Sequence, residues 1–191
     1  MSLFKEFPKI SRWSRDVVIT EKLDGTNACI IVRKDAVSNY VNAQSRNRLI
    51  TPEDDNYGFA KWVEANKDFL ASTLGEGYHY GEWWGQGIQR GYGLKEKKFS
   101  LFNVTRWQHI KDGQIGKEIG LDVVPILWAG PMDTTHLHVD LCMQQLEAQG
   151  SVAAKGFMNP EGIVIFHSAN GALFKKTFEK DQEGKGNAKD A

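Results

Sequence analysis

The sequence predicts a mixed α+β fold in which antiparallel strands dominate and two or three helices accompany them. Two observations lead to this prediction. Short apolar runs, rich in β-branched and aromatic residues, recur along the chain, and only two segments have apolar residues at helical spacing. The chain has 191 residues, of which 41% are hydrophobic, so we expect one domain with a core of its own.

The first two strands are expected on either side of a polar turn. Residues 17–19 and 28–32 are apolar, whereas residues 21–27 read Glu-Lys-Leu-Asp-Gly-Thr-Asn. Later apolar runs predict further strands, at residues 77–84, 99–104, 123–127, 162–167 and 172–178.

Two helices are predicted from capping residues and spacing. Residues 51–54, Thr-Pro-Glu-Asp, have the composition of a helix start, and apolar residues recur at roughly helical spacing between 59 and 70. The second helix is expected from about residue 133 to 149, because Gly150 is a natural terminator. Residues 1–178 are therefore expected to form the folded domain. Residues 179–191 are charged and nearly free of apolar side chains, which predicts a flexible polar tail.

The composition limits the classes of protein to consider. Basic and acidic side chains number 24 each, so a polyanion would have to bind at a local basic patch. Cys29 and Cys142 form no zinc pattern and no disulfide framework, which suits a reducing compartment. No run approaches the length of a membrane span, and residues 1–14 do not have the pattern of a secretory signal, so we expect a cytoplasmic protein.

The polar turn carries the first chemical signal. A strand, turn and strand can hold the Lys22 amine beside the Asp24 carboxylate at the mouth of a sheet, although many surface turns have the same composition. The Lys-Leu-Asp-Gly sequence resembles motif I of the covalent nucleotidyltransferases, which comprise DNA ligases, RNA ligases and mRNA capping enzymes. In those families the lysine attacks the α-phosphorus of a nucleoside triphosphate. A lysine attacks only as the free amine, which cationic neighbours or a bound metal favour.

Partners for a nucleotide follow in the order of the family's motifs. Ser45-Arg46 resembles motif Ia, whose arginine offers a fork of donors to phosphate or ribose, and Arg48 is a second candidate; a solvated loop is the alternative. Glu82 resembles the motif III glutamate that binds a ribose hydroxyl. Phe102 resembles the motif IIIa aromatic residue that stacks on the purine, with Phe99 in reserve.

Two further motifs concern charge on the phosphates. Glu161 precedes a β-branched strand and resembles motif IV, whose acid helps to hold a divalent metal; Asp24 is the expected second ligand. Oxygen ligands of this kind suit Mg²⁺, with Mn²⁺ as an alternative. Lys175 and Lys176 resemble motif V, in which lysines contact the α-phosphate. Because adjacent side chains on a strand face opposite ways, one of them is expected to face the nucleotide; Lys175 is preferred and Lys176 stays open.

Six such matches in order favour the ligase interpretation, and the resemblance covers roughly residues 20–178. The flanking Glu21 and Asn27, assigned to nucleotide contacts, are most similar to phage and bacterial RNA ligases. The resemblance implies the nucleotidyltransferase fold of ligases and capping enzymes, with antiparallel sheets flanking a nucleotide cleft. It also implies a reaction in which Lys22 takes AMP from ATP, passes it to a 5′-phosphate and seals that end to a 3′-hydroxyl.

The resemblance leaves several alternatives open. The substrate is expected to be a nucleic acid with 5′-phosphate and 3′-hydroxyl ends, with RNA favoured over DNA. Many relatives carry an added C-terminal OB-fold domain, for which this sequence has no counterpart, so an accessory protein is a candidate partner. A DNA ligase, a capping-type guanylyltransferase, a small-molecule adenylating enzyme and a non-catalytic nucleic-acid-binding module are the rival interpretations.

Overall fold

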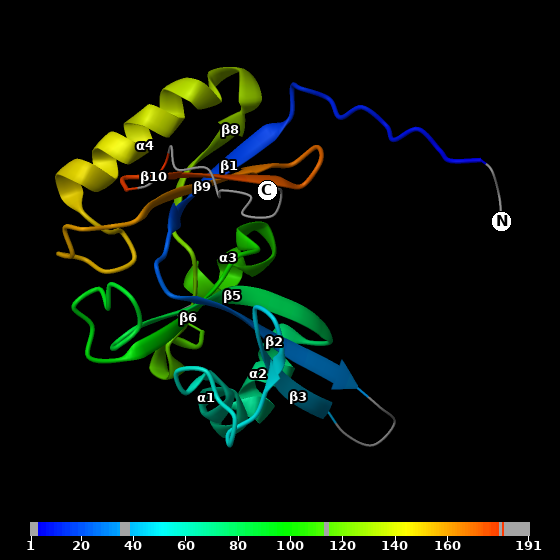
Figure 1. Cartoon of the computed structure of the whole chain (residues 1–191), viewed down its shortest axis with the longest axis vertical. Helices are drawn as coiled ribbons and strands as arrows, with labels where there is room; N and C mark the ends of the chain where they lie inside the picture. The colour runs from blue at the N-terminus through cyan, green and yellow to red at the C-terminus, as the bar shows by residue number, and fades with distance from the viewer. Residues whose placement is uncertain (1–3, 35–38, 113–114, 180, 182–191) are drawn as a thin grey trace, which may run out of the picture.

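The computed structural model describes residues 4–34, 39–112, 115–179 and 181, and within them the strands form two sheets (Figure 1). Sheet A has the order β10-β9-β1-β8, from β10 (Ala172–Thr177), β9 (Gly162–His167), β1 (Asp16–Lys22) and β8 (Ile126–Pro131). Sheet B has the order β4-β3-β2-β5-β6-β7, from β4 (Leu49–Ile50), β3 (Asn39–Ser45), β2 (Thr26–Lys34), β5 (Gly77–Gly85), β6 (Lys97–Leu101) and β7 (Leu121–Val123). All pairings described are antiparallel except β6 with β7. The predicted α+β class with antiparallel sheets is confirmed.

The helices cover one face of each sheet. Those against sheet B are α1 (Phe59–Ala65), α2 (Lys67–Leu74) and α3 (Val104–Asp112), and the long α4 (Thr135–Gln149) packs on sheet A. Two short 3-10 helices, η1 (Lys117–Ile119) and η2 (Met132–Thr134), complete the described elements. None of the helices in the described part of the chain has the length and apolar character needed to cross a bilayer.

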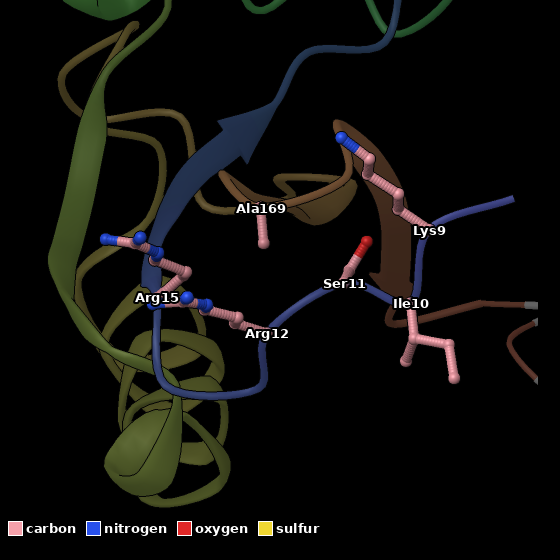
Figure 2. A pocket seen from close by; sticks show the side chains of 6 residues that line it. All are labelled: Lys9, Ile10, Ser11, Arg12, Arg15 and Ala169. Atoms are coloured by element: carbon pink, nitrogen blue, oxygen red, sulfur yellow. The ribbon is translucent and has the colours of Figure 1, made fainter.

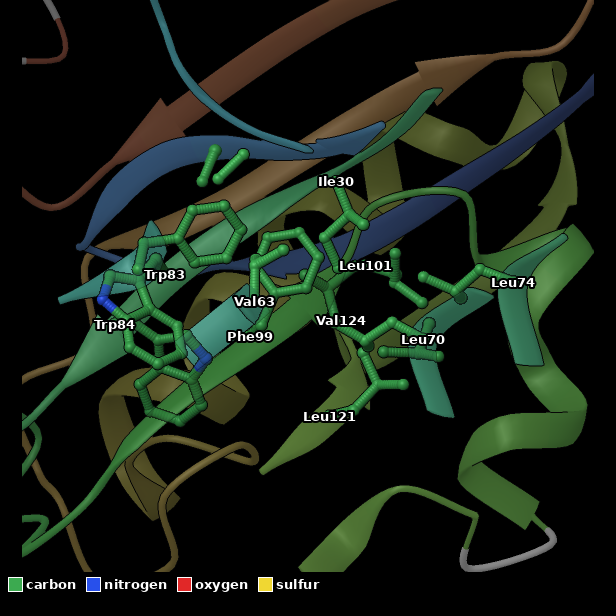
Figure 3. Packing of buried hydrophobic residues seen from close by; sticks show 14 of the residues in the cluster. Ile30, Val63, Leu70, Leu74, Trp83, Trp84, Phe99, Leu101, Leu121 and Val124 are labelled. Atoms are coloured by element: carbon green, nitrogen blue, oxygen red, sulfur yellow. The ribbon is translucent and has the colours of Figure 1, made fainter. Parts of the chain in front are cut away.

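The larger core lies between sheet B and its helices (Figure 3). Phe59 of α1 packs within 5.3 Å of Trp83 and 5.1 Å of Phe99, measured between ring centroids, so aromatic contacts join the helix to β5 and β6. The smaller core lies between sheet A and α4, where Ile19 and Ile163 meet Leu146. One face of each sheet is thereby covered.

Some predicted boundaries were wrong. The first helix begins at Phe59 and not at residue 51, because Thr51 Oγ1 accepts the Asp54 amide in a tight turn and Asp55 accepts the Ala60 amide. The strand predicted at 99–104 stops at Leu101, and α3 follows it.

The run at 123–127 also divides. Val123 ends β7 in sheet B and Ile126 begins β8 in sheet A, with Pro125, which has no N–H to donate, between them. The second predicted helix is confirmed as α4, which Gly150 terminates with a positive φ of 79°. Of the predicted tail, only residues 179 and 181 are described, so that prediction lies largely outside the described residues.

Candidate active site

Lys22 lies where the chain leaves sheet A for sheet B, and its amine meets a carboxylate that is distant in sequence. Lys22 Nζ is 2.6 Å from Glu161 Oε2, although the two residues are 139 positions apart. The antiparallel register that pairs Lys22 with Gly162 places Glu161 at the adjoining end of β9. The side chains are only 25% and 18% exposed, so the ion pair is largely shielded from water. Two residues that the sequence assigned to one site are thus in direct contact.

Glu82 approaches the same turn from sheet B. Its Oε1 accepts the Gly25 amide at 3.1 Å, and the register of β2 and β5 sets Asn27 opposite Glu82. Burial raises the pKa of Glu82 to about 7, against the opposing effects of Lys22, the Gly25 amide and Arg46. Arg46 directly follows β3, whose last residue, Ser45, pairs with Ala28 of β2, next to Asn27. A Cβ on Gly25 would lie 2.4 Å from the Trp83 carbonyl oxygen, so this close approach requires glycine.

Asp24 is held by a residue that the sequence prediction missed. Arg90 Nε is 3.0 Å from Asp24 Oδ2, and Nη1 donates to the Asn159 carbonyl at 3.3 Å. Arg90 Nη2 lies 3.3 Å from Glu179 Oε1, so one guanidinium joins three segments of the chain. The neighbouring Tyr92 is buried, and its hydroxyl accepts the Asp24 amide at 2.8 Å.

The loop that delivers Arg90 had a visible signal in the sequence. Four glycines between residues 85 and 93 have positive φ, as do Gln89 and Tyr92, and Ile88 anchors the loop in the core. The glycines alone did not distinguish this compact loop from a flexible turn. Its contact with Asp24 spans 66 positions, which no local pattern reports.

The two lysines of β10 face opposite sides of sheet A. Lys175 is in register with Val164 and, through β9, with Thr20, so it shares the Lys22 face. Lys176 is in register with Ile163 on the face that α4 covers, and its Nζ lies 3.2 Å from Asp140 Oδ1 of α4. The preference for Lys175 agrees with this register, and the alternative, Lys176, is placed on the far side.

The remaining predicted residues divide into two groups. Phe102 follows β6 and is 40% exposed, whereas its reserve Phe99 is fully buried in the core. Arg48 Nη1 and Nη2 donate to Asp54 Oδ2 and Oδ1 at 2.6 and 3.0 Å, and this pair stabilises the turn before α1. Phe102 is thus available to a ligand, whereas the described contacts of Arg48 serve the fold.

Glu21 also has a structural partner. Its Oε2 accepts the amides of Val152 and Ala153, each at 2.9 Å, and burial raises the pKa of its carboxyl group. Glu21 pairs with Ile163 in the sheet, so its side chain lies on the opposite face from Lys22. The structure therefore brings the Lys22, Asp24, Glu82 and Glu161 side chains to one turn, and leaves Glu21 and Arg48 in supporting positions.

The donors present would suit a divalent ion that keeps most of its water. Within the ranges described, no group of three or more His, Cys, Asp and Glu side chains is arranged to hold a metal. Asp24 and Glu161 supply carboxylate oxygens near Lys22, and each is paired with a cation. Mg²⁺ typically takes one or two carboxylates together with waters and substrate phosphates. The residues fit such an ion once a nucleotide contributes oxygens.

The comparisons with known proteins define the class. The family model described as RNA ligase matches residues 15–177, and the chain belongs to this family. None of the curated proteins matches the sequence.

The fold recurs in solved structures of Naegleria gruberi RNA ligase. A variant with ATP and Mn is 21% identical with a TM-score of 0.58, over 85% of this chain and 49% of that chain. An apo variant is 22% identical with a TM-score of 0.59, over 86% and 50%. A variant with AMP and Mn is 22% identical with a TM-score of 0.58, again over 86% and 50%. The chain thus has the fold of part of that ligase and spans about half of its length.

Proposed function

We propose that this chain is the nucleotidyltransferase domain of an ATP-dependent RNA ligase, formed by residues 1–178 with the nucleotide bound between the two sheets. Lys22 forms a lysyl-AMP, transfers AMP to the 5′-phosphate of a strand, and a 3′-hydroxyl then displaces AMP. The observation that carries the proposal is the Lys22–Glu161 contact, with Glu82 at the same turn and Lys175 on the same sheet face. Membership of the RNA ligase family favours this chemistry over the rival classes.

In the first step the Lys22 nitrogen attacks the α-phosphorus, the new P–N bond forms, and the bond to pyrophosphate breaks. The ion pair must open before attack, because an ammonium group has no free electron pair. Glu161 is the base nearest to Nζ and is placed to receive the proton. Lys175 offsets phosphate charge as pyrophosphate leaves.

The nucleoside is held by groups on the strands of sheet B or directly after them. Glu82 accepts a ribose hydroxyl, Arg46 donates to ribose or phosphate, and Phe102 stacks on the adenine. Asn27, opposite Glu82, contributes a further polar contact. When Mg²⁺ or Mn²⁺ is present, it neutralises phosphate oxygens, and the residues that would hold it are Asp24 and Glu161.

The second and third steps transfer AMP to the 5′-phosphate and then join the two ends. A 5′-phosphate oxygen attacks the phosphorus of lysyl-AMP and the Lys22 nitrogen leaves with a proton restored. The 3′-hydroxyl oxygen then attacks the 5′-phosphorus, its proton passes to solvent, and AMP leaves as the phosphodiester forms. Arg90 keeps the Asp24 carboxylate directed at the turn throughout, so we assign it a positioning role.

The solved relatives support the choice of ligands and residues. The Naegleria ligase was crystallised with ATP and Mn, with AMP and Mn, and with pyrophosphate. Its solved variants include substitutions at a lysine and an aspartate two positions apart, the separation of Lys22 and Asp24. They also include substitutions at a glutamate and a lysine fourteen positions apart, the separation of Glu161 and Lys175. Because the chain spans half of that ligase, a further domain or accessory protein is proposed to help grip the strands.

The test is the intact mass of the protein after incubation with ATP and Mg²⁺, beside parallel samples with GTP. The expected result is a gain of one AMP with ATP only, abolished in Lys22→Ala and kept in Lys176→Ala, which removes the same charge from the far face. Adduct with GTP alone would indicate a guanylyltransferase. Absence of any adduct would overturn the proposal and favour a binding module. Joining of 5′-phosphorylated RNA, with a DNA strand of equal length in parallel, then separates the two ligase substrates.

A further inference from the structure

A cavity lies at the end of sheet A that is farthest from Lys22. It has a volume of about 310 Å³ and is lined by Lys9, Ile10, Ser11, Arg12, Arg15 and Ala169 (Figure 2). Residues 4–15 precede β1, whereas Lys22 is the last residue of that strand. A strand of seven residues, Asp16–Lys22, separates the cavity from the reactive amine by roughly 20 Å, at about 3.3 Å per residue.

The lining has an excess of positive charge. Lys9, Arg12 and Arg15 supply three cations, and no carboxylate residue is among the lining residues. In the described part of the chain, none of these three side chains forms an ion pair or hydrogen bond. The whole chain is balanced, with 24 basic and 24 acidic side chains, so this local excess is not a property of the surface in general. Figure 2 shows the Arg12 and Arg15 side chains extending to the same side, whereas the Lys9 side chain points away from them; an anion with successive charged groups would match cations spread in this way.

The backbone beside the cavity is fixed by three contacts. The Arg15 carbonyl accepts the Met132 amide at 3.2 Å, and the Asp16 carbonyl accepts the Ser168 amide at 3.0 Å. The His167 ring nitrogen Nε2 lies 3.3 Å from the Trp13 carbonyl oxygen. The chain before β1 is therefore attached to the start of η2 and to the β9–β10 turn, so Arg12 and Arg15 extend from an anchored segment.

Exposed apolar side chains alternate with the cations. Phe7, Ile10 and Trp13 are 80%, 87% and 66% exposed, and each is followed within two residues by a member of the cationic set. Proteins that bind single-stranded nucleic acid combine cations that follow the backbone with aromatic side chains on which bases stack. A free phosphate ion would make no use of these apolar side chains.

We propose that Lys9, Arg12 and Arg15 bind successive backbone phosphates of the nucleic-acid strand, several nucleotides from the end that reacts at Lys22. This inference rests on the proposed ligase function and adds a second anchoring point to it. Arginine guanidinium groups match phosphate oxygens in a bidentate geometry. Phe7, Ile10 and Trp13 provide apolar contacts to the neighbouring bases.

The test compares Arg12→Gln/Arg15→Gln with a matched control, Lys95→Gln/Lys117→Gln, which removes two exposed cations elsewhere. Binding of a fluorescent 5′-phosphorylated RNA of about twenty nucleotides is measured at several salt concentrations. The cavity variant is expected to bind about tenfold more weakly. The slope of log affinity against log salt should fall by about 0.7 for each phosphate that the variant no longer neutralises. The control should match the wild type in both quantities.

Two further measurements distinguish binding of a strand phosphate at the cavity from binding of a free anion there. A 5′-phosphorylated dinucleotide, too short to span roughly 20 Å, should bind the wild type and the cavity variant equally. Millimolar inorganic phosphate should not displace the long strand; displacement at the cavity would overturn the assignment in favour of a free anion site. Equal long-strand binding by the cavity variant and the control would also overturn it. Formation of the Lys22 adduct is recorded for every variant, so failure of the ligase function is detected separately from failure of this site.

Discussion

Cationic side chains lie at both ends of β1, but among the residues that the structure describes they form ion pairs with carboxylates only at the Lys22 end. At the Lys22 end, Lys22 is paired with Glu161 and Arg90 with Asp24, each within 3.0 Å. At the Asp16 end, the cations of residues 9–15 have no such partners among the described residues. Paired charges fix the geometry of a small site and must separate before reaction, whereas unpaired cations attract a polyanion over a longer range. The difference suggests that chemistry is confined to one end of the strand and strand binding to the other.

The largest effect is expected from the nucleophile itself. Lys22→Ala removes the only nitrogen in the proposed attack, so formation of the adduct should fall by at least about a thousandfold. Adduct is measured by intact mass after incubation with ATP and Mg²⁺. Unaltered adduct formation in this variant would contradict the assignment of the reaction to the Lys22 end of β1.

The two faces of β10 provide the next comparison. Lys175→Ala should slow adduct formation by about a hundredfold, because this variant has no cation there to stabilise the leaving phosphates. Lys176→Ala should change the rate by less than about threefold, since its described partner is the exposed Asp140 of α4. The rates come from a time course of adduct mass. A reversal of the order would mean that the register of β9 and β10 does not decide which lysine serves the nucleotide.

Substitution of Arg90 tests whether its ion pair with Asp24 positions the Asp24 carboxylate. Arg90→Ala should slow adduct formation by about tenfold and raise the Mg²⁺ concentration needed for half-maximal rate, because Asp24 loses its partner. Arg90→Lys should recover part of both effects. Glu179→Gln removes only the exposed partner of Arg90 and serves as the control, with an expected change of less than about twofold. Equal metal dependence in Arg90→Ala and the wild type would contradict the positioning role.

The smallest effect concerns stability and pH. The pKa of Glu82 is raised to about 7 by burial, so ionisation of this carboxyl group costs free energy in the folded state. The stability that the protonated group contributes is fully present below the unfolded pKa and disappears as the pH rises through about 7. Relative to Glu82→Gln, the wild type should therefore lose about 2 kcal/mol of unfolding free energy between pH 5 and pH 8. Urea unfolding at both pH values measures this; a constant difference would show that Glu82 is not in a desolvated site.

Local patterns predicted the elements that depend on local chemistry. The strands around Lys22, the helix α4 and the strand that follows Glu161 are all close to their predicted positions. Of the residues assigned from the motifs, Lys22, Asp24, Glu82 and Glu161 lie around one turn, and their roles stay predictions. The predicted elements follow from periodicity and from the glycine that ends α4, which short segments contain.

Long-range contacts could not be predicted in this way. Arg90 reaches Asp24 across 66 positions, and the glycine-rich loop gave no indication of where its arginine points. Glu21 resembled a nucleotide contact, yet its carboxylate binds the amides of residues 152 and 153, more than 130 positions away. Arg48 was likewise assigned to the nucleotide because it lies close to Arg46 in the sequence, although its guanidinium group forms an ion pair with Asp54. For Arg90 and Glu21 the partner is supplied by tertiary packing, whereas Arg48 pairs with Asp54, which lies only six positions away.

The central claim is that Lys22 is the residue that carries AMP. The most direct measurement is tandem mass spectrometry of proteolytic peptides from protein incubated with ATP and Mg²⁺, stopped without acid because phosphoramidates are acid-labile. The account predicts a single modified peptide, which contains Lys22, with AMP on its side-chain nitrogen. AMP on Lys175, on another residue, or on no peptide while strands are still joined would contradict it.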